Sequence, residues 1–159
     1  MGKKLRRIVS GGRMEPSVVN AVGVWFYSLD TKRCLYLMRK DSKNPNTWGL
    51  PGGKCDRNEN LLDTINRECI EEMGSMPDYI KLMPLEQFTS QDSSFVYHTF
   101  FACVAAEFTP TLNYEHQGYA WLDSKVWPRP LHPGLWNMVN SDAVLQKVET
   151  ITNNFQTSQ

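Results

Sequence analysis

The sequence lacks three features that would point to specialised classes of protein. No apolar run approaches the roughly 18 to 20 residues that a transmembrane helix needs, so we expect no membrane span. The four cysteines include no C-x-x-C pair, which gives neither a thiolate zinc motif nor a disulfide framework. Positive charge is not in excess, because Lys plus Arg and Asp plus Glu number 17 each. Charge therefore indicates neither a dedicated nucleic-acid binder nor a binder of anionic membranes.

What remains is the composition of one ordinary globular domain. A chain of 159 residues, 41% of them hydrophobic, is long enough to bury one core. We find no internal repeat and no linker, and we expect a basic N-terminal extension over 1–17, a single domain over 18–150 and a polar C-terminal tail over 151–159. No apolar signal segment follows the basic residues, so reduced thiols and a cytoplasmic location are expected. An organelle transit peptide is the alternative interpretation of the extension.

The first part of the domain predicts a β-hairpin followed by a glycine-rich loop. Residues 18–29 are rich in β-branched and aromatic types, and 33–39 predicts a second strand after a polar turn. The polar segment 40–46 contains a proline and predicts a loop. It leads into the segment Trp48-Gly49-Leu50-Pro51-Gly52-Gly53, where the glycines indicate a sharp bend of the backbone.

The rest of the domain alternates between helical and strand patterns. Apolar residues at helical spacing predict a helix over 61–73. Strands are predicted over 79–89 and 95–106, the second so apolar that both of its faces should be buried. A short strand over 119–122 precedes a last helix over 135–150. The pattern predicts an α/β domain, with a mixed sheet between helices.

Three glutamates crowd the last turns of the helix predicted over 61–73. Glu68, Glu71 and Glu72 are spaced i, i+3 and i+4, so they share one helical face. Acids near a helix C-terminus oppose the helix dipole by roughly 0.3 to 1 kcal/mol each, and Glu72 projects toward the apolar side, where an unpaired charge is costly. A divalent cation resolves the conflict because Mg²⁺ and Mn²⁺ prefer hard oxygen ligands. A solvated acidic helix end, with Arg67 as a surface partner, is the alternative.

A longer motif surrounds these glutamates. From Gly53 the chain has five residues, Glu59, seven residues and then Arg67-Glu68-Cys69-Ile70-Glu71-Glu72-Met73-Gly74-Ser75. This segment resembles the Nudix box, G-x5-E-x7-R-E-U-x-E-E-x-G-U, in which U is a bulky apolar residue. Every fixed position matches, which makes a chance match very improbable. The departures are mild, namely Cys69 at the first U position and the polar Ser75 at the second.

The resemblance to the Nudix family implies a fold, a reaction and a cofactor. The fold is an α/β/α sandwich around a mixed sheet, and the reaction is hydrolysis of a nucleoside diphosphate linked to a group X. Mg²⁺, or Mn²⁺ in its place, is the expected cofactor. The expected metal ligands are the side chains of Glu68, Glu71 and Glu72, which are also the expected catalytic residues, and the backbone carbonyl of Gly52. Glu59 and Arg67 are expected to hold the loop and the helix together.

The proton acceptor and the substrate contacts are encoded less specifically. In the family the base is either a glutamate of the box or an acid on a distal loop, and Glu115 lies where the loop acid is expected. Arg39, Lys40 and Lys54 flank the glycine loop, and we expect Arg39 and Lys54 to contact phosphates. A solvated surface position is the alternative for each of these charges. An aromatic side chain should stack on the base, with Trp48 as our candidate among Trp25, Trp48, Tyr97, Trp121 and Trp127.

Hydrolysis of a small nucleotide is the favoured function, the substrate being a nucleoside triphosphate, a nucleotide sugar or a dinucleoside polyphosphate. One alternative is an RNA 5′-end pyrophosphohydrolase, which should show a basic channel and which the neutral charge balance disfavours. The other is a non-catalytic nucleotide-binding module, which should have lost an acid of the box. The expected partner is thus a nucleotide-type small molecule, with no membrane and no nucleic acid other than an RNA 5′ end. An exposed hairpin edge could also pair in a homodimer.

Overall fold

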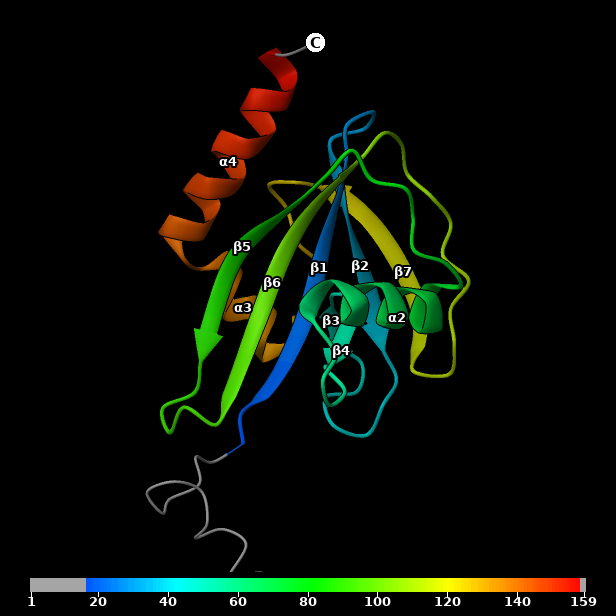
Figure 1. Ribbon diagram of the computed structural model, residues 1–159. Coiled ribbons are helices and arrows are strands. Elements are labelled where there is room, and N and C mark those ends of the chain that lie inside the picture. Colours follow the sequence, from blue (N-terminus) through cyan, green and yellow to red (C-terminus); the bar gives the residue numbers. More distant parts are fainter. Residues whose placement is uncertain (1–16, 158–159) are drawn as a thin grey trace, which may run out of the picture.

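A mixed β-sheet with helices on both faces forms the protein, as the computed structural model of residues 17–157 shows (Figure 1). Apart from Ser17, the extension predicted over 1–17 lies outside the described residues. The strands in chain order are β1 (Val19–Ser28), β2 (Arg33–Arg39), β3 (Trp48–Gly49), β4 (Gly52–Lys54), β5 (Lys81–Thr89), β6 (Phe95–Val104) and β7 (His116–Asp123). The helices are α2 (Leu61–Met73), α3 (Pro133–Val139) and α4 (Asp142–Thr157).

The sheet combines parallel and antiparallel pairing. Its order is β3–β2–β1–β6–β5, with β4 paired to β1 and β7 paired to β2. β1 and β2 form the predicted antiparallel hairpin, and β1 runs parallel to β6 along its whole length. The other pairings between named strands are antiparallel. The predicted α/β fold with a mixed sheet is therefore confirmed.

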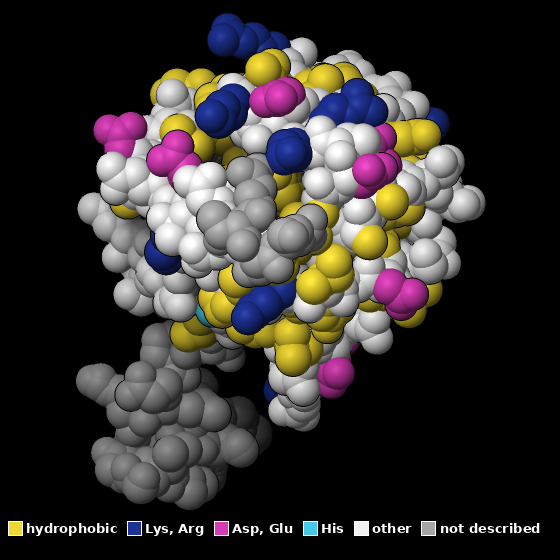
Figure 2. Space-filling view, turned by 90° about the horizontal axis from the view of Figure 1, so that it is seen from above, with side chains coloured by type: hydrophobic (Ala, Val, Ile, Leu, Met, Phe, Trp, Pro, Cys, Tyr) yellow, Lys and Arg dark blue, Asp and Glu magenta, His cyan; other side chains and the backbone are white. Residues whose placement is uncertain are grey.

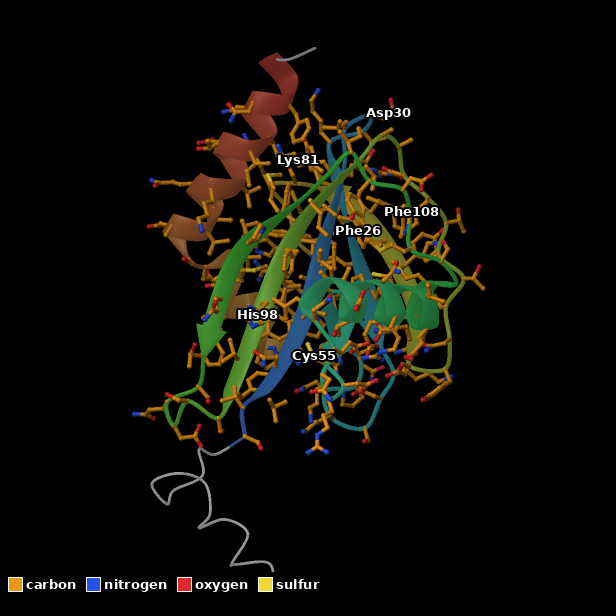
Figure 3. The ribbon with its side chains drawn as sticks, viewed as in Figure 1. Phe26, Asp30, Cys55, Lys81, His98 and Phe108 are labelled. Atoms are coloured by element: carbon orange, nitrogen blue, oxygen red, sulfur yellow. The ribbon has the colours of Figure 1, made fainter. Side chains whose placement is uncertain are left out.

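Strand β1 lies in the middle of the sheet and is buried on both faces. Val24 and Phe26 belong to the core cluster under α2, whereas Trp25 and Tyr27 belong to the cluster under α3 and α4. Successive side chains of a strand point to opposite faces, so an unbroken apolar run is what a central strand requires. Phe26 packs edge to face against Phe108, with ring centroids 5.4 Å apart (Figure 3). Figure 1 shows α2 crossing one face of the sheet while α3 lies behind the other.

Strand β6 is buried only in part, which differs from the prediction for 95–106. Residues 99–104 are buried, but residues 95–98 are half exposed. The reason is that neither core cluster extends to this end of β6, where a cavity replaces a packed helix. The strand pattern alone does not reveal where the covering helices stop.

The C-terminal helix predicted over 135–150 is in fact two helices. The chain breaks after α3 and begins α4 at Asp142, where the hydroxyl of Ser141 accepts a hydrogen bond from the amide of Val144. α4 continues to Thr157, because Ile151 and Phe155 extend its apolar face against the second core cluster. The polar tail expected from 151 onward is therefore wrong as far as 157. Among the described helices, none combines the length and the apolar character needed to cross a membrane.

Candidate active site

Helix α2 presents the predicted glutamates in its C-terminal half. It begins after Asn60, whose side chain caps a backbone amide, and ends at Gly74, which has a left-handed φ of 86°. Both ends agree with the prediction. Ile65 and Cys69 are buried in the core cluster, and this orientation turns Glu72 inward so that it is only 4% exposed. The prediction that Glu72 is shielded from water is confirmed.

Two glycines of strand β4 allow its backbone to contact these carboxylates. It pairs with β1, which places Gly52 opposite Gly23. The amide of Gly52 donates a hydrogen bond to Oε1 of Glu72 at 3.1 Å. A Cβ atom on Gly53 would collide with the carboxylate of Glu68, and one on Gly52, whose φ is +154°, would collide with the backbone of β1. Glycine is therefore required at both positions for the strand and the glutamates to lie this close.

The end of β4 is fixed to the sheet by a chain of hydrogen bonds. The amide of Cys55 donates to the carbonyl of Asn20 at 2.8 Å. The side-chain oxygen of Asn20 in turn lies 3.0 Å from Nε2 of His98 on β6. Burial lowers the pKa of His98, so its ring is neutral at physiological pH. Figure 3 shows Cys55 and His98 at the same end of the sheet. The glycine strand is thus held to β1, and Asn20 of β1 is itself held by β6.

Arg67 ties the helix to the glycine strand. Its guanidinium donates to both carboxylate oxygens of Glu59 at 2.9 Å and to the carbonyl oxygen of Lys54 at 3.0 Å. It also donates to Glu68 at 3.0 Å and to Glu71 at 3.3 Å. The hydrogen bonds from Arg67 are the main reason that the pKa of Glu59 falls to about 2. The structure therefore brings Glu59 and Arg67 together as an ion pair between loop and helix.

Glu68 and Glu72 form an acidic pair in which Glu72 is buried and Glu68 is partly buried. Burial is the main cause that raises the pKa of Glu72 to about 9, with the charges of Glu68 and Glu115 acting in the same direction and the amide of Gly52 opposing them. Burial also raises the pKa of Glu68, against the opposing effect of Arg67. The two carboxyl groups lie close enough for each to shift the pKa of the other. Without an added cation, the pair therefore retains a proton at neutral pH.

The carboxylates of Glu68 and Glu72 are suitable ligands for a hard divalent cation, although the glutamates of α2 do not yet surround a common point. Within the part of the chain that the structure describes, no three His, Cys, Asp or Glu side chains converge to form a ready metal cluster. Glu71 is the glutamate kept apart, since half of its side chain is exposed and it faces Arg67. Glu68 and Glu72 supply oxygen atoms and negative charge in a partly dry setting. Those are the properties that Mg²⁺ and Mn²⁺ require.

Glu115 lies close enough to Glu72 to influence it electrostatically. It lies in the loop immediately before β7, which begins earlier than the predicted strand over 119–122 because β7 pairs along the whole of β2. Asn113 accepts a hydrogen bond from its amide and donates one to its carboxylate at 3.1 Å. Its negative charge is close enough to raise the pKa of Glu72. The structure therefore brings this loop acid to the predicted site.

The three predicted substrate contacts have different surroundings. Arg39 makes a two-pronged ion pair with Asp41, at 2.6 and 3.0 Å, at the end of β2. Lys54 is exposed at the end of β4 and lines a cavity beside it. Trp48 packs against the second core cluster and does not line that cavity. Trp48 is partly buried among these apolar neighbours, and its contact with a base stays a prediction.

The cavity has a volume of about 330 Å³ and lies on the α3 side of the sheet. Gly53 belongs to its wall and also faces the carboxylate of Glu68, so this glycine links the cavity to the acidic pair, although none of the glutamates of α2 lines the cavity. Tyr97 was one of five aromatic candidates, and it lines this space. The sequence patterns did not single out Phe88 and Phe95, which line the cavity as well. Phe88 is brought to it by pairing with Tyr97 of β6, and Phe95 by pairing with Val19 of β1.

The family model of the NUDIX domain matches residues 18–140, so this chain belongs to the Nudix family. Members of the family generally use a divalent metal. A relative described as nucleoside triphosphatase NudI, from Escherichia fergusonii, is 28% identical over 89 residues. That match covers 49% of this chain and 62% of the relative, so the chain spans about three fifths of the length of the relative it matches.

Solved structures show the same fold. A MutT NUDIX hydrolase from Burkholderia pseudomallei superimposes with a TM-score of 0.63 at 24% identity, covering 84% of this chain and 98% of that one. The Nudix hydrolase RenU from M. smegmatis superimposes with a TM-score of 0.61 at 21% identity, covering 92% of each chain. At this level of identity the likeness establishes the architecture, and the chemistry has to be argued from the site.

Proposed function

We propose that this protein is a divalent-cation-dependent pyrophosphohydrolase that cleaves the phosphoanhydride bond of a nucleoside diphosphate linked to a group X. The observation that carries the proposal is the buried contact between Glu68 and Glu72 beside the glycine strand. Burying two acids in contact destabilises a fold unless a cation compensates them. Strongly shifted pKa values next to an open cavity are typical of a catalytic centre.

A nucleoside triphosphate is the substrate that we favour. The relative from Escherichia fergusonii is described as a nucleoside triphosphatase, and this chain retains every fixed residue of the Nudix box. A non-catalytic nucleotide-binding module should lack one of the box acids, and none is missing. The cavity next to Gly53 is large enough for a base and sugar, with the phosphates directed toward the acidic pair.

The chain's own residues have separable tasks in this mechanism. A bound divalent cation supplies Lewis-acid stabilisation of the anhydride oxygens and lowers the pKa of water. Glu68, Glu72 and the carbonyl oxygen of Gly52 would hold it, joined by Glu71 once that side chain turns from Arg67. Arg67 restrains the rotamer of Glu68 through the hydrogen bond at 3.0 Å, and its pairing with Glu59 keeps the loop against the helix.

Glu115 is our candidate to accept the proton of the attacking water. A base must lie within hydrogen-bonding reach of that water, directly or through a second one. Glu115, in the loop before β7, is near enough for its charge to act on Glu72. Its hydrogen bond from Asn113 holds the carboxylate in a defined orientation. Lys54 lines the cavity next to Gly53 and is placed to meet a phosphate oxygen. Arg39 can do so only by exchanging Asp41 for phosphate.

One face of the described surface gives no support to an RNA end as the substrate. On the face shown in Figure 2, basic and acidic side chains are interspersed and do not form a continuous basic strip among the described residues. An RNA-binding channel should gather positive charge along the path of the backbone. This face therefore adds no argument for an RNA substrate, and a small nucleotide remains the substrate that we favour.

The proposal is tested by incubating the protein with a panel of substrates in Mg²⁺ or Mn²⁺. The panel contains nucleoside triphosphates, nucleotide sugars, dinucleoside polyphosphates and an RNA with a 5′-triphosphate, and ion-exchange chromatography identifies the bond that breaks. We expect hydrolysis of a nucleoside triphosphate that EDTA abolishes. Glu149→Gln, which changes an exposed glutamate of α4, should retain full activity as a control. Turnover of the RNA alone, or of no substrate in either metal, would overturn the proposal.

A further inference from the structure

The cavity beside the acidic pair has mostly apolar walls. It is lined by β1, β4, β5, β6 and α3, and its apolar surface comes from residues such as Leu50, Phe88, Phe95, Leu135 and Met138. The Phe88 side chain is 53% exposed, so its ring is available to a ligand. An apolar cavity with an accessible aromatic ring and few polar groups suits a flat heterocycle.

A bulge in β5 directs a carboxylate into this cavity. The register between β5 and β6 shifts between Pro84 and Glu86. After the shift, Glu86 lies opposite Thr99, and Phe88 lies opposite Tyr97. Directly opposite residues of an antiparallel pair point to the same face, so Glu86 and Phe88 share the face of the cavity. Without the extra residue, the strand would turn Glu86 to the other side of the sheet.

Glu86 has no partner within the part of the chain that the structure describes. No described residue makes a hydrogen bond or an ion pair with its side chain, although it is partly buried in the cavity wall. Asn137, on α3, also lines the cavity, and its side chain likewise makes no hydrogen bond to a described residue. An ionised carboxylate accepts hydrogen bonds only, so a ligand that satisfies Glu86 must present N–H or O–H donors.

We propose that Glu86 selects a base whose ring edge carries two adjacent N–H donors, as guanine does with N1–H and its 2-amino group. This inference rests on the proposed function and names the substrate class of the same site. Two parallel N–H donors match the two oxygens of one carboxylate. Adenine and cytosine place a ring acceptor beside their amino group, and uracil flanks its single N–H with carbonyl oxygens. Each of them would set a lone pair against the Glu86 carboxylate.

The test compares the affinities of GMP and IMP, which differ only in the 2-amino group. Calorimetry in the presence of Mg²⁺ measures both affinities without relying on turnover. We expect wild-type protein to bind GMP about tenfold more tightly than IMP, the effect of one hydrogen bond to a charged group that is partly exposed. Glu86→Gln should reduce this ratio to about two or less. Glu149→Gln removes an exposed carboxylate outside the cavity and should keep the tenfold ratio.

Three results would overturn the inference, namely equal affinities of the wild type for GMP and IMP, an unchanged ratio in Glu86→Gln, and no binding of either nucleotide. Turnover of triphosphates by a protein that does not distinguish GMP from IMP would leave the proposed function standing. A tenfold preference for GMP without any turnover would support the role of Glu86 and would contradict the proposed function. Pterins share the same ring edge, and neopterin monophosphate as a third ligand distinguishes a pterin site from a guanine site.

Discussion

Replacing Glu72 by glutamine should stabilise the protein while abolishing its activity. Glu72 is buried, and its pKa is raised from 4.5 to about 9. A carboxyl group with a raised pKa in the folded state binds more protons there than in the unfolded chain. The free energy of unfolding therefore falls as pH rises from about 4.5 to about 9, by up to 1.4 kcal/mol per unit. Glutamine keeps the acceptor for the amide of Gly52 and removes this pH-dependent loss.

The size of the gain follows from the same pKa values. At pH 7.5 the metal-free wild type has lost at most about 4 kcal/mol through Glu72, and coupling to Glu68 reduces this to about 2 to 4 kcal/mol. For a chain of this size each kcal/mol corresponds to roughly 2 to 4 °C in Tm. We therefore expect Glu72→Gln to melt about 4 to 16 °C above the wild type in EDTA at pH 7.5, and the difference should vanish near pH 4.5.

Thermal unfolding followed by circular dichroism between pH 4.5 and 8.5 measures this difference. Glu71→Gln is the matched control, because Glu71 is half exposed and faces Arg67, so its loss should bring no such gain. Adding Mg²⁺ should raise the Tm of the wild type and have little effect on Glu72→Gln. If Glu72→Gln melts at or below the wild type in EDTA at pH 8, the buried acidic pair is not under the electrostatic strain that we infer.

The remaining predictions concern the shell around this pair. Arg67→Ala leaves Glu59 and Glu68 without their shared donor, and denaturant titration should show a loss of about 1 to 3 kcal/mol in the free energy of unfolding; an unchanged midpoint would contradict the role of Arg67. Gly53→Ala places a Cβ against the carboxylate of Glu68, so steady-state kinetics should show kcat at least tenfold lower. An unchanged kcat would show that β4 and Glu68 can accommodate the extra methyl group. Glu115→Gln should lower kcat by about 10² to 10⁴ with little change in Tm if Glu115 is the base, whereas unchanged kcat would assign that task to a glutamate of the box.

The sequence predicts the parts of the site that depend on local spacing. Helix periodicity places Ile65 and Glu72 on the same side of α2, so the burial of Glu72 follows from the pattern of apolar residues. The neighbouring glycines follow from the same motif, since a strand that contacts carboxylates cannot carry side chains there. The mixed sheet likewise follows from alternating strand and helix patterns.

Parts of the site that depend on pairing between distant strands could not be predicted. Glu86 reaches the cavity because of one extra residue in β5, and a register shift of one residue reverses the face of every following side chain. Trp48 packs against the core cluster under α3, a helix distant in sequence, and does not line the cavity, which its own position in the chain could not predict. The end of α4 was misplaced because Phe155 packs against that same core, whereas the flanking residues are polar.

Direct titration with Mn²⁺ tests the central claim, which is that Glu68 and Glu72 form a site for a divalent cation. The electron paramagnetic resonance signal of free Mn²⁺ is recorded during titration of the wild type and of Glu72→Gln, each with a non-hydrolysable nucleoside triphosphate. The account predicts that the wild type binds Mn²⁺, that Mg²⁺ displaces it, and that the variant binds it at least tenfold more weakly. If the wild type does not reduce the signal of free Mn²⁺, or if the variant binds Mn²⁺ as tightly as the wild type, the claim is contradicted.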